Sequence, residues 1–313
     1  MTSAALVSPR LYGVFAASVL ALFAASLVVG AGSGTAALLL PSRLPRSLAA
    51  LLAGAGLAIA GLVMQTIARN RFVEPSTVGA TQSAGLGILA AAVFMPEAPI
   101  VLKMAAATLT ALAGTALFLG LARRLPPTQP LLLPLFGIVY SSVVGAALTF
   151  LAWQADLLQF VEIWMNGEFS GVVRGRYELL FAAALMVALA WWAADRLTVA
   201  ALGPAVATGL GLDLAATRRL GVVIVAVVSA LTVVVVGALP FVGLVVPAMV
   251  SRLVGDNLRA SLPLVALGGA GLVLAADIAG RLVRYPYEIP VGTILGVVGA
   301  LVFLWLLWRG QHG

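Results

Sequence analysis

The side chains that most often carry out chemistry in proteins are nearly absent from this sequence. It has no cysteine, one histidine (His312, in the C-terminal tail) and one lysine, Lys103. A Walker loop needs a lysine directly after a glycine-rich turn, and no such turn precedes Lys103. Metal sites and catalytic triads built on histidine or cysteine are excluded as well. Because no pair of carboxylates is placed for acid–base work either, the sequence predicts that the protein is not an enzyme.

The acidic residues also lack the placement expected of an ion-driven carrier. Such carriers place carboxylates or the polar ends of broken helices near the middle of the bilayer. Here every acid falls at the end of an apolar run or in a loop, and Asp195 and Asp277 come closest to being exceptions. Asp277 lies one helical turn before Arg281, so a local ion pair explains it better than an ion pathway. The energy source is therefore expected in another subunit, with an ion-coupled secondary carrier as the alternative.

The elements that must position these few residues are membrane spans. Hydrophobic residues make up 62% of the 313-residue chain and charged residues only 9%, which is typical of a polytopic membrane protein. Residues 1–313 are expected to form one all-α membrane domain, and the third and eighth of its spans are short. The ten predicted spans are 11–30, 47–67, 82–95, 100–121, 131–152, 178–195, 220–239, 241–253, 262–278 and 289–308.

The second predicted span carries unusually many small residues. Ala50, Gly54 and Ala58 recur at a spacing of four, with Gly56 and Gly61 beside them. In lipid, such residues let another helix approach closely. This span is therefore predicted to lie inside a bundle rather than to serve as an anchor.

The distribution of basic residues predicts the orientation. With the N-terminus in the cytoplasm, eleven of the 18 basic residues fall inside and seven outside, the direction that the positive-inside rule expects. Both termini are therefore expected in the cytoplasm of a cell whose inner membrane the chain crosses several times.

The longest predicted cytoplasmic connection, residues 197–220, is too polar to span the membrane and too apolar for a free linker. It is expected to form two short helices broken at Gly209–Gly211, with Gly203, Ala207 and Gly211 at a spacing of four. Two interpretations are open: an amphipathic segment lying on the membrane, or a docking surface for a cytosolic motor.

Four segments of the chain resemble the FecCD-type permeases, the membrane subunits of ABC importers for ferric siderophores, haem and cobalamin. They are RLPRSLAALLAGAGLAIAG (43–61), RNRFVEPSTVGA (69–80), PFVGLVVPAMVSRLVGDNLR (240–259) and ADIAGRLVRYPYEIPVGTILGVVGALVF (276–303). The resemblance implies the ten-transmembrane-helix fold of type II ABC importer permeases. The variants RNRF and GDNLRASLP look most like the branch that imports catecholate-type ferric siderophores, with haem or cobalamin as the alternative cargo. The chain departs from many members at Ala248, where they have histidine.

The resemblance also implies partners and site residues. Arg43, Arg46 and Arg281 match arginines that dock a periplasmic substrate-binding protein, for which the bidentate guanidinium suits carboxylates; the alternative is that they only reach lipid headgroups. A second permease and two cytosolic ATPases would complete the importer; a paralogue is favoured as the second permease, with an identical copy as the alternative. ATP and Mg²⁺ would bind the ATPases, and this chain is expected to hold no cofactor or metal and to bind no nucleic acid.

The remaining implied site residues lie on the cytoplasmic side. The resemblance places a cytoplasmic gate on two short connections and the ATPase contact on the 197–220 segment. The residues are Asn70, Phe72, Thr128 and Gln129 for the gate, and Gly203, Ala207 and Gly211 for ATPase coupling.

Overall fold

The computed structural model describes residues 8–30, 39–71, 73–75, 79–122, 124–125, 132–255 and 257–310, and nearly all of this part of the chain is helical. Its only β-type pairing within those ranges is an isolated bridge between Asn166 and Ala238. The elements are α1 (Pro9–Val28), a π-helical turn η1 (Leu39–Arg43), α3 (Leu44–Ala68), α4 (Ala80–Phe94), α5 (Ile100–Ala122), α6 (Leu132–Gln154), α7 (Leu158–Met165), α8 (Leu180–Trp192), α9 (Ala194–Ala201), α10 (Pro204–Gly209), α11 (Leu214–Val236), α12 (Val242–Val254), α13 (Leu258–Leu282) and α14 (Val291–Gly310).

Polar caps and glycines set the ends of these helices. The side chain of Asp213 accepts from the backbone N–H of Ala216 at 2.9 Å where α11 begins, and Asn257 accepts from Ala260 at 3.3 Å where α13 begins. Such caps satisfy N–H groups that have no partner in the first turn. At its other end α11 stops at Gly237, whose φ of +79° suits glycine.

Each of the ten spans predicted from the sequence coincides with one helix: α1, α3, α4, α5, α6, α8, α11, α12, α13 and α14. Six of these helices in the described chain are long and apolar enough to cross a membrane by themselves, and α8 with α9 makes a seventh that bends by 62°. The apolar parts of α4, α12 and α14 are shorter. The prediction of short third and eighth spans is thus confirmed, since α4 has 15 residues and α12 has 13.

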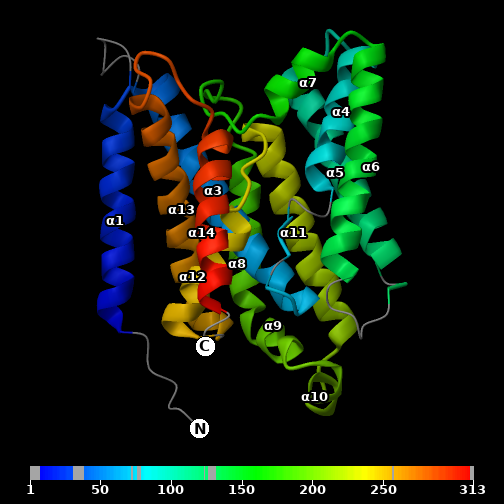
Figure 1. Ribbon diagram of the computed structural model, residues 1–313, viewed down its shortest axis with the longest axis vertical. Coiled ribbons are helices and arrows are strands. Elements are labelled where there is room, and N and C mark those ends of the chain that lie inside the picture. Colours follow the sequence, from blue (N-terminus) through cyan, green and yellow to red (C-terminus); the bar gives the residue numbers. More distant parts are fainter. Residues whose placement is uncertain are drawn as a thin grey trace.

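The helix α3 lies at the centre of the bundle, between α13, α12 and α11 (Figure 1). Glycine makes this possible, because a Cβ atom on Gly54 would lie 2.3 Å from the carbonyl oxygen of Gly269 on α13. A Cβ on Gly61 would lie 1.9 Å from the carbonyl oxygen of Gly243 on α12. Backbones therefore touch directly at both places. The prediction that the second span is buried is confirmed: 78% of its apolar window lies inside the protein.

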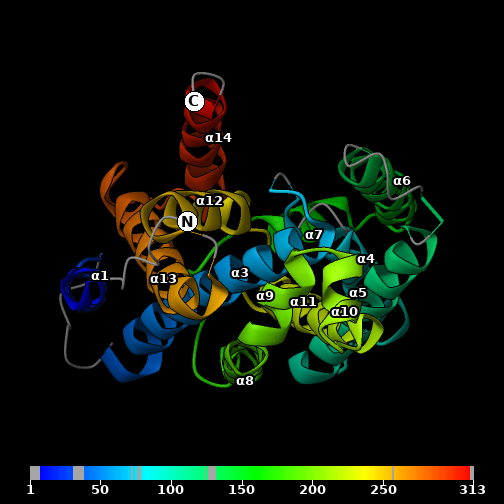
Figure 2. The same ribbon diagram turned by 90° about the horizontal axis from the view of Figure 1, so that it is seen from below.

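Other helices surround this centre and leave wide faces uncovered. In the apolar windows of α1, α5 and α6, only 11%, 28% and 22% of the residues are buried. Seen along the bundle, α14 extends away from the other helices (Figure 2). The segment with α9 and α10 lies at one end of the bundle, and η1, the last turn of α13 and α7 lie at the opposite end (Figure 1).

Three segments far apart in sequence are joined by backbone hydrogen bonds near the end of α7. The carbonyl of Gly167 accepts from the N–H of Gly292 at 2.8 Å, and the carbonyl of Met165 accepts from Ala238 at 3.1 Å. A Cβ on Gly167 would lie 2.2 Å from the oxygen of Ala238, so only glycine fits there. Irregular backbone of this kind is tolerated within a membrane protein where other protein covers it.

Candidate functional site

An arginine cluster occupies the end of the bundle opposite α10. In the first turn of α3, Arg46 donates from Nε and Nη2 to Oδ1 of Asp277 on α13, at 3.0 and 2.8 Å. Its third nitrogen, Nη1, donates to Glu288 in the α13–α14 connection at 3.0 Å. One guanidinium thus joins two carboxylates that come from different parts of the chain.

The second oxygen of Asp277 is taken by Arg281, which lies one turn further along α13. The Arg281 guanidinium also donates to the hydroxyl of Ser26 at 2.6 Å and to the carbonyls of Ser26 and Val29, at 2.9 and 2.7 Å. Asp277 has no exposed surface and Arg281 is only 4% exposed. The local pairing expected from the sequence is therefore confirmed, and it belongs to a larger network that ties α1, α3 and α13 together.

Arg43 acts on the end of α1. Its Nη1 donates to the carbonyls of Leu27 and Val28, each at 3.0 Å, where α1 ends. A cation at this position also complements the negative end of the helix dipole.

The three arginines predicted to dock a partner thus come together at one end, but their side chains are not exposed on its surface. Arg43 and Arg281 are 7% and 4% exposed, and their donors point into the bundle. A partner's carboxylate could reach Arg46 most directly, although the side chain of Arg46 is itself only 13% exposed. Docking by these residues stays a prediction, with Arg46 as its best candidate.

At the opposite end, the 197–220 segment forms the two short helices that were predicted, α9 and α10, but their break lies elsewhere. It falls at Leu202 and Gly203, not at Gly209–Gly211, where α10 ends and a turn leads into α11. Because Gly203 precedes α10 and Gly211 follows it, the residues at a spacing of four do not form a face of one helix. Ala207 is fully buried against its own chain.

A different set of residues faces outward in this segment. Three apolar side chains are exposed in and beside α10: Leu202 in the break before the helix (58%), Val206 within it (47%) and Leu210 directly after it (66%). We call them the α10 apolar stripe. The sequence indicated the small residues because such residues are typical of helix contacts. The exposed face of so short a helix depends on where the chain breaks, which the sequence did not show.

The turn after α3 touches the same segment. Arg69 ends α3 in the left-handed conformation (φ +50°), and a Cβ built on Gly203 would lie 3.4 Å from its Nη1. Next to it, Asn70 is 8% exposed and its N–H donates to the carbonyl of Gln65 at 3.1 Å. Of the predicted gate residues, only Asn70 is described; Phe72, Thr128 and Gln129 lie outside the described residues. The gate assignment stays a prediction, and the turn lies directly against the break before α10.

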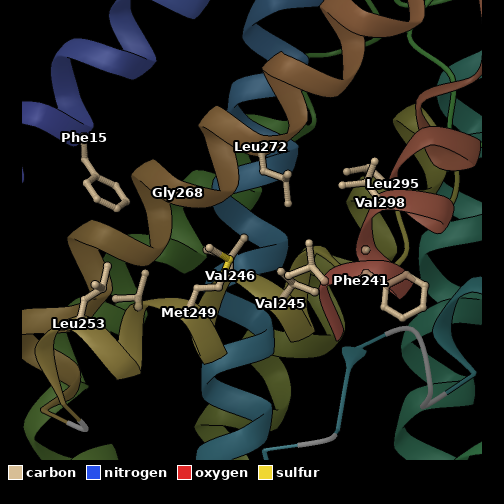
Figure 3. Close-up of a pocket in the computed structure, with 13 residues that line it drawn as sticks. Phe15, Phe241, Val245, Val246, Met249, Leu253, Gly268, Leu272, Leu295 and Val298 are labelled. Carbon is tan, nitrogen blue, oxygen red and sulfur yellow. The ribbon is translucent and has the colours of Figure 1, made fainter. Parts of the chain in front are cut away.

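One cavity is an apolar groove of about 340 Å³ among α1, α12, α13 and α14. Figure 3 shows Phe15 of α1 on one side, Leu295 and Val298 of α14 on the other, and Met249 of α12 between them. Every residue lining it is apolar, so it offers no hydrogen bond to a polar chelate. Its position and lining suit lipid or another helix better than a cargo.

A second cavity, of about 20 Å³, lies beside Glu74, Ser229 and Thr81 and is large enough for one water molecule. Ser229 is 2% exposed, and its hydroxyl has no hydrogen-bond partner among the described residues. Within this part of the chain, no group of three or more His, Cys, Asp or Glu side chains could hold a metal ion.

Comparison with known proteins shows which family has this architecture. The FecCD transport family matches residues 29–309. The petrobactin import system permease protein YclN of Bacillus subtilis (strain 168) is 41% identical over 274 residues, which cover 88% of this chain and 87% of the relative. The ferric-anguibactin transport system permease protein FatD of Vibrio anguillarum is 40% identical over 272 residues, 87% of either chain.

A solved structure described as an inward-facing conformation of a metal-chelate type ABC transporter has the same fold. It aligns with a TM-score of 0.86 and 26% identity, over 96% of this chain and 99% of its own. The resemblance seen in the sequence motifs is thereby confirmed. The chain belongs to the FecCD transport family, as a multi-pass membrane permease subunit of an ABC transporter and not as an enzyme.

Proposed function

We propose that this permease moves a ferric siderophore, of the catecholate type, from a periplasmic binding protein to the cytoplasm. The proposal rests on family membership together with one structural observation, that the two ends of the bundle present different surfaces. One end holds Arg46, the arginine of the cluster that an acidic partner could reach most directly, and the other presents the α10 apolar stripe. Two relatives, a petrobactin permease and a ferric-anguibactin permease, support the cargo class.

The α10 apolar stripe is the proposed contact for the cytosolic ATPase. It lies in the connection between α8 and α11, where exposed leucine and valine side chains have no hydrocarbon to cover them once α10 projects beyond the bundle (Figure 1). Apolar surface that water would otherwise cover gains about 25 cal/mol per Å² when a partner buries it. ATP binding would pull two ATPases together, and the short helices would pass that movement to the turn at Arg69, which lies against Gly203.

The cargo pathway is proposed to lie between two permeases, each with ten spans and with both termini in the cytoplasm. The outer face of α6 supports this arrangement, because Ser142, Ala146 and Thr149 follow one stripe and all three are exposed. Small and partly polar side chains suit the wall of a pathway that binds its cargo weakly better than they suit a surface in contact with lipid. The two permeases are expected to be paralogues, as in the branch that the motifs resemble.

Reconstitution tests the proposal. The permease, its partner permease and the ATPase would be placed in liposomes, with the binding protein outside and radiolabelled iron supplied as ferric petrobactin. Iron should enter only with ATP and should continue to enter when a protonophore removes the proton gradient. If haem or cobalamin is taken up and ferric petrobactin is not, the assigned cargo is wrong. If uptake is driven by an ion gradient without ATP, the protein is not part of an ATP-driven importer.

A further inference from the structure

The two sides of the Arg46 guanidinium meet carboxylates in very different surroundings. The Nε and Nη2 side holds Asp277, which has no exposed surface and is also bound to Arg281. The Nη1 side holds Glu288, whose side chain is 33% exposed. Asp277 therefore fixes the direction of the guanidinium, and Nη1 is the nitrogen nearest to solvent.

Glu288 has the character of a contact that can be exchanged. In the described chain its carboxylate pairs with Arg46 at 2.9 Å, whereas Asp277 pairs with both Arg46 and Arg281. Ion pairs that remain partly in water are weak, and salt screens them further. The neighbouring backbone is held, since the N–H of Ile289 donates to the carbonyl of Gly280 at 3.0 Å. Rotation of the Glu288 side chain alone would therefore free Nη1 without unfolding the connection.

We propose that Glu288 is an internal substitute for the partner's carboxylate, which it resembles chemically and with which it competes for Nη1 of Arg46. The inference rests on the proposed function, because it needs an acidic binding protein at this end. In the free permease, Glu288 neutralises the Nη1 side of the guanidinium, whose direction Asp277 fixes. When the binding protein docks, its Asp or Glu side chain takes the place of Glu288, so the permease discriminates against weakly charged surfaces.

The test compares the dissociation constants of the purified binding protein of the same import system for permease variants in lipid nanodiscs, at low and high salt. Glu288→Gln keeps the shape of the side chain and removes the competing charge, so binding should tighten by about three- to tenfold at low salt and by less at high salt. Glu97→Gln is the matched control, because it removes one exposed carboxylate from the predicted outer side without freeing Arg46. It should change binding by less than about twofold.

The dependence on Arg46 provides the second measurement. Arg46→Gln should weaken binding, and adding Glu288→Gln to it should have no further effect, since there is no guanidinium left to free. If Glu288→Gln weakens binding or leaves it unchanged while Arg46→Gln weakens it, Glu288 is a fixed brace and the inference is wrong. If wild-type permease does not bind the protein at all, the proposed function fails, and the inference fails with it.

Discussion

At the scale of single residues, the unusual feature is a fully buried carboxylate between two guanidinium groups. Burying ions is costly, and the cost is recovered only when every charged atom has a partner in good geometry. Asp277 meets this condition, because Arg46 takes one of its oxygens and Arg281 the other. Ser26 and the carbonyls at the end of α1 satisfy the remaining donors of Arg281.

We predict that Asp277→Ala lowers the stability of the permease by about 3–5 kcal/mol, because it leaves the buried charge of Arg281 without a carboxylate and leaves Arg46 with Glu288 alone. Thermal unfolding of the detergent-solubilised protein would measure the loss. Asp195→Ala is the control, since Asp195 also pairs with an arginine, Arg259 at 2.6 Å, but both side chains are more than half exposed. It should cost about 1 kcal/mol or less. Equal losses would show that burial is not what makes Asp277 important.

The sequence could predict part of this network. The pair Asp277–Arg281 follows from helical periodicity, because residues four apart share a face. The contacts of Arg46 could not be found in this way, since Asp277 and Glu288 lie 231 and 242 positions away. The burial of the three arginines could not be predicted either. An arginine at a helix end can reach the lipid headgroups or turn into the bundle, and the neighbouring helices determine which of the two it does.

At the scale of elements, close backbone contacts place α3 at the centre of the bundle. The small residues of its sequence predicted such packing, and the structure shows where it occurs, at Gly54 against α13 and at Gly61 against α12. The helix boundaries followed from apolar length, but the break between α9 and α10 did not. Glycines at 203, 209 and 211 offered several possible breaks, and the packing of Ala207 against its own chain fixed the choice.

Replacing Gly61 by alanine should push α3 and α12 apart, because the new methyl group would lie 1.9 Å from a backbone oxygen that cannot rotate away. We expect markedly less folded protein and a lower unfolding temperature, measured by size-exclusion chromatography with heating. Gly120→Ala on α5, where nothing lies within 4 Å, should change neither and is the matched control. Normal behaviour of the Gly61 variant would mean that the two helices are not in direct contact.

The α10 apolar stripe gives a second prediction at this scale. Val206→Glu places a charge in the middle of the proposed ATPase contact, so co-purification of the ATPase and ATP-driven uptake should both be lost while the permease still inserts. Thr208→Glu introduces the same charge at an exposed position on another side of α10. It should retain most of the association. If both variants bind the ATPase equally well, the contact lies elsewhere.

At the scale of the whole molecule, the described helices cross the bundle in alternating directions, which puts the arginine cluster and α10 at opposite ends (Figure 1). The count of basic residues predicts that α10 faces the cytoplasm. Since the chain has no cysteine, single introduced cysteines report orientation without interference.

Cysteines at Glu97 and Ser170, both exposed, should react with an impermeant thiol reagent in intact spheroplasts. A cysteine at Thr208 on α10 should react only after the membrane is opened. Labelling of position 208 alone in intact cells would reverse the orientation, and with it the sides assigned to the two partners.

The distance along the chain between Arg46 and Asp277 also has a consequence for synthesis. The ribosome adds about 5–20 residues per second, so α3 enters the membrane roughly 10–50 seconds before the carboxylate that neutralises its arginine has been made. During that interval Arg46 must wait among the headgroups, and the long side chain at a helix end is suited to do so. Only the arrival of α13 lets it turn inward. A chain that stops before α13 would keep an unmatched cation at its surface, a mark by which quality-control proteases could distinguish an unfinished permease from a complete one.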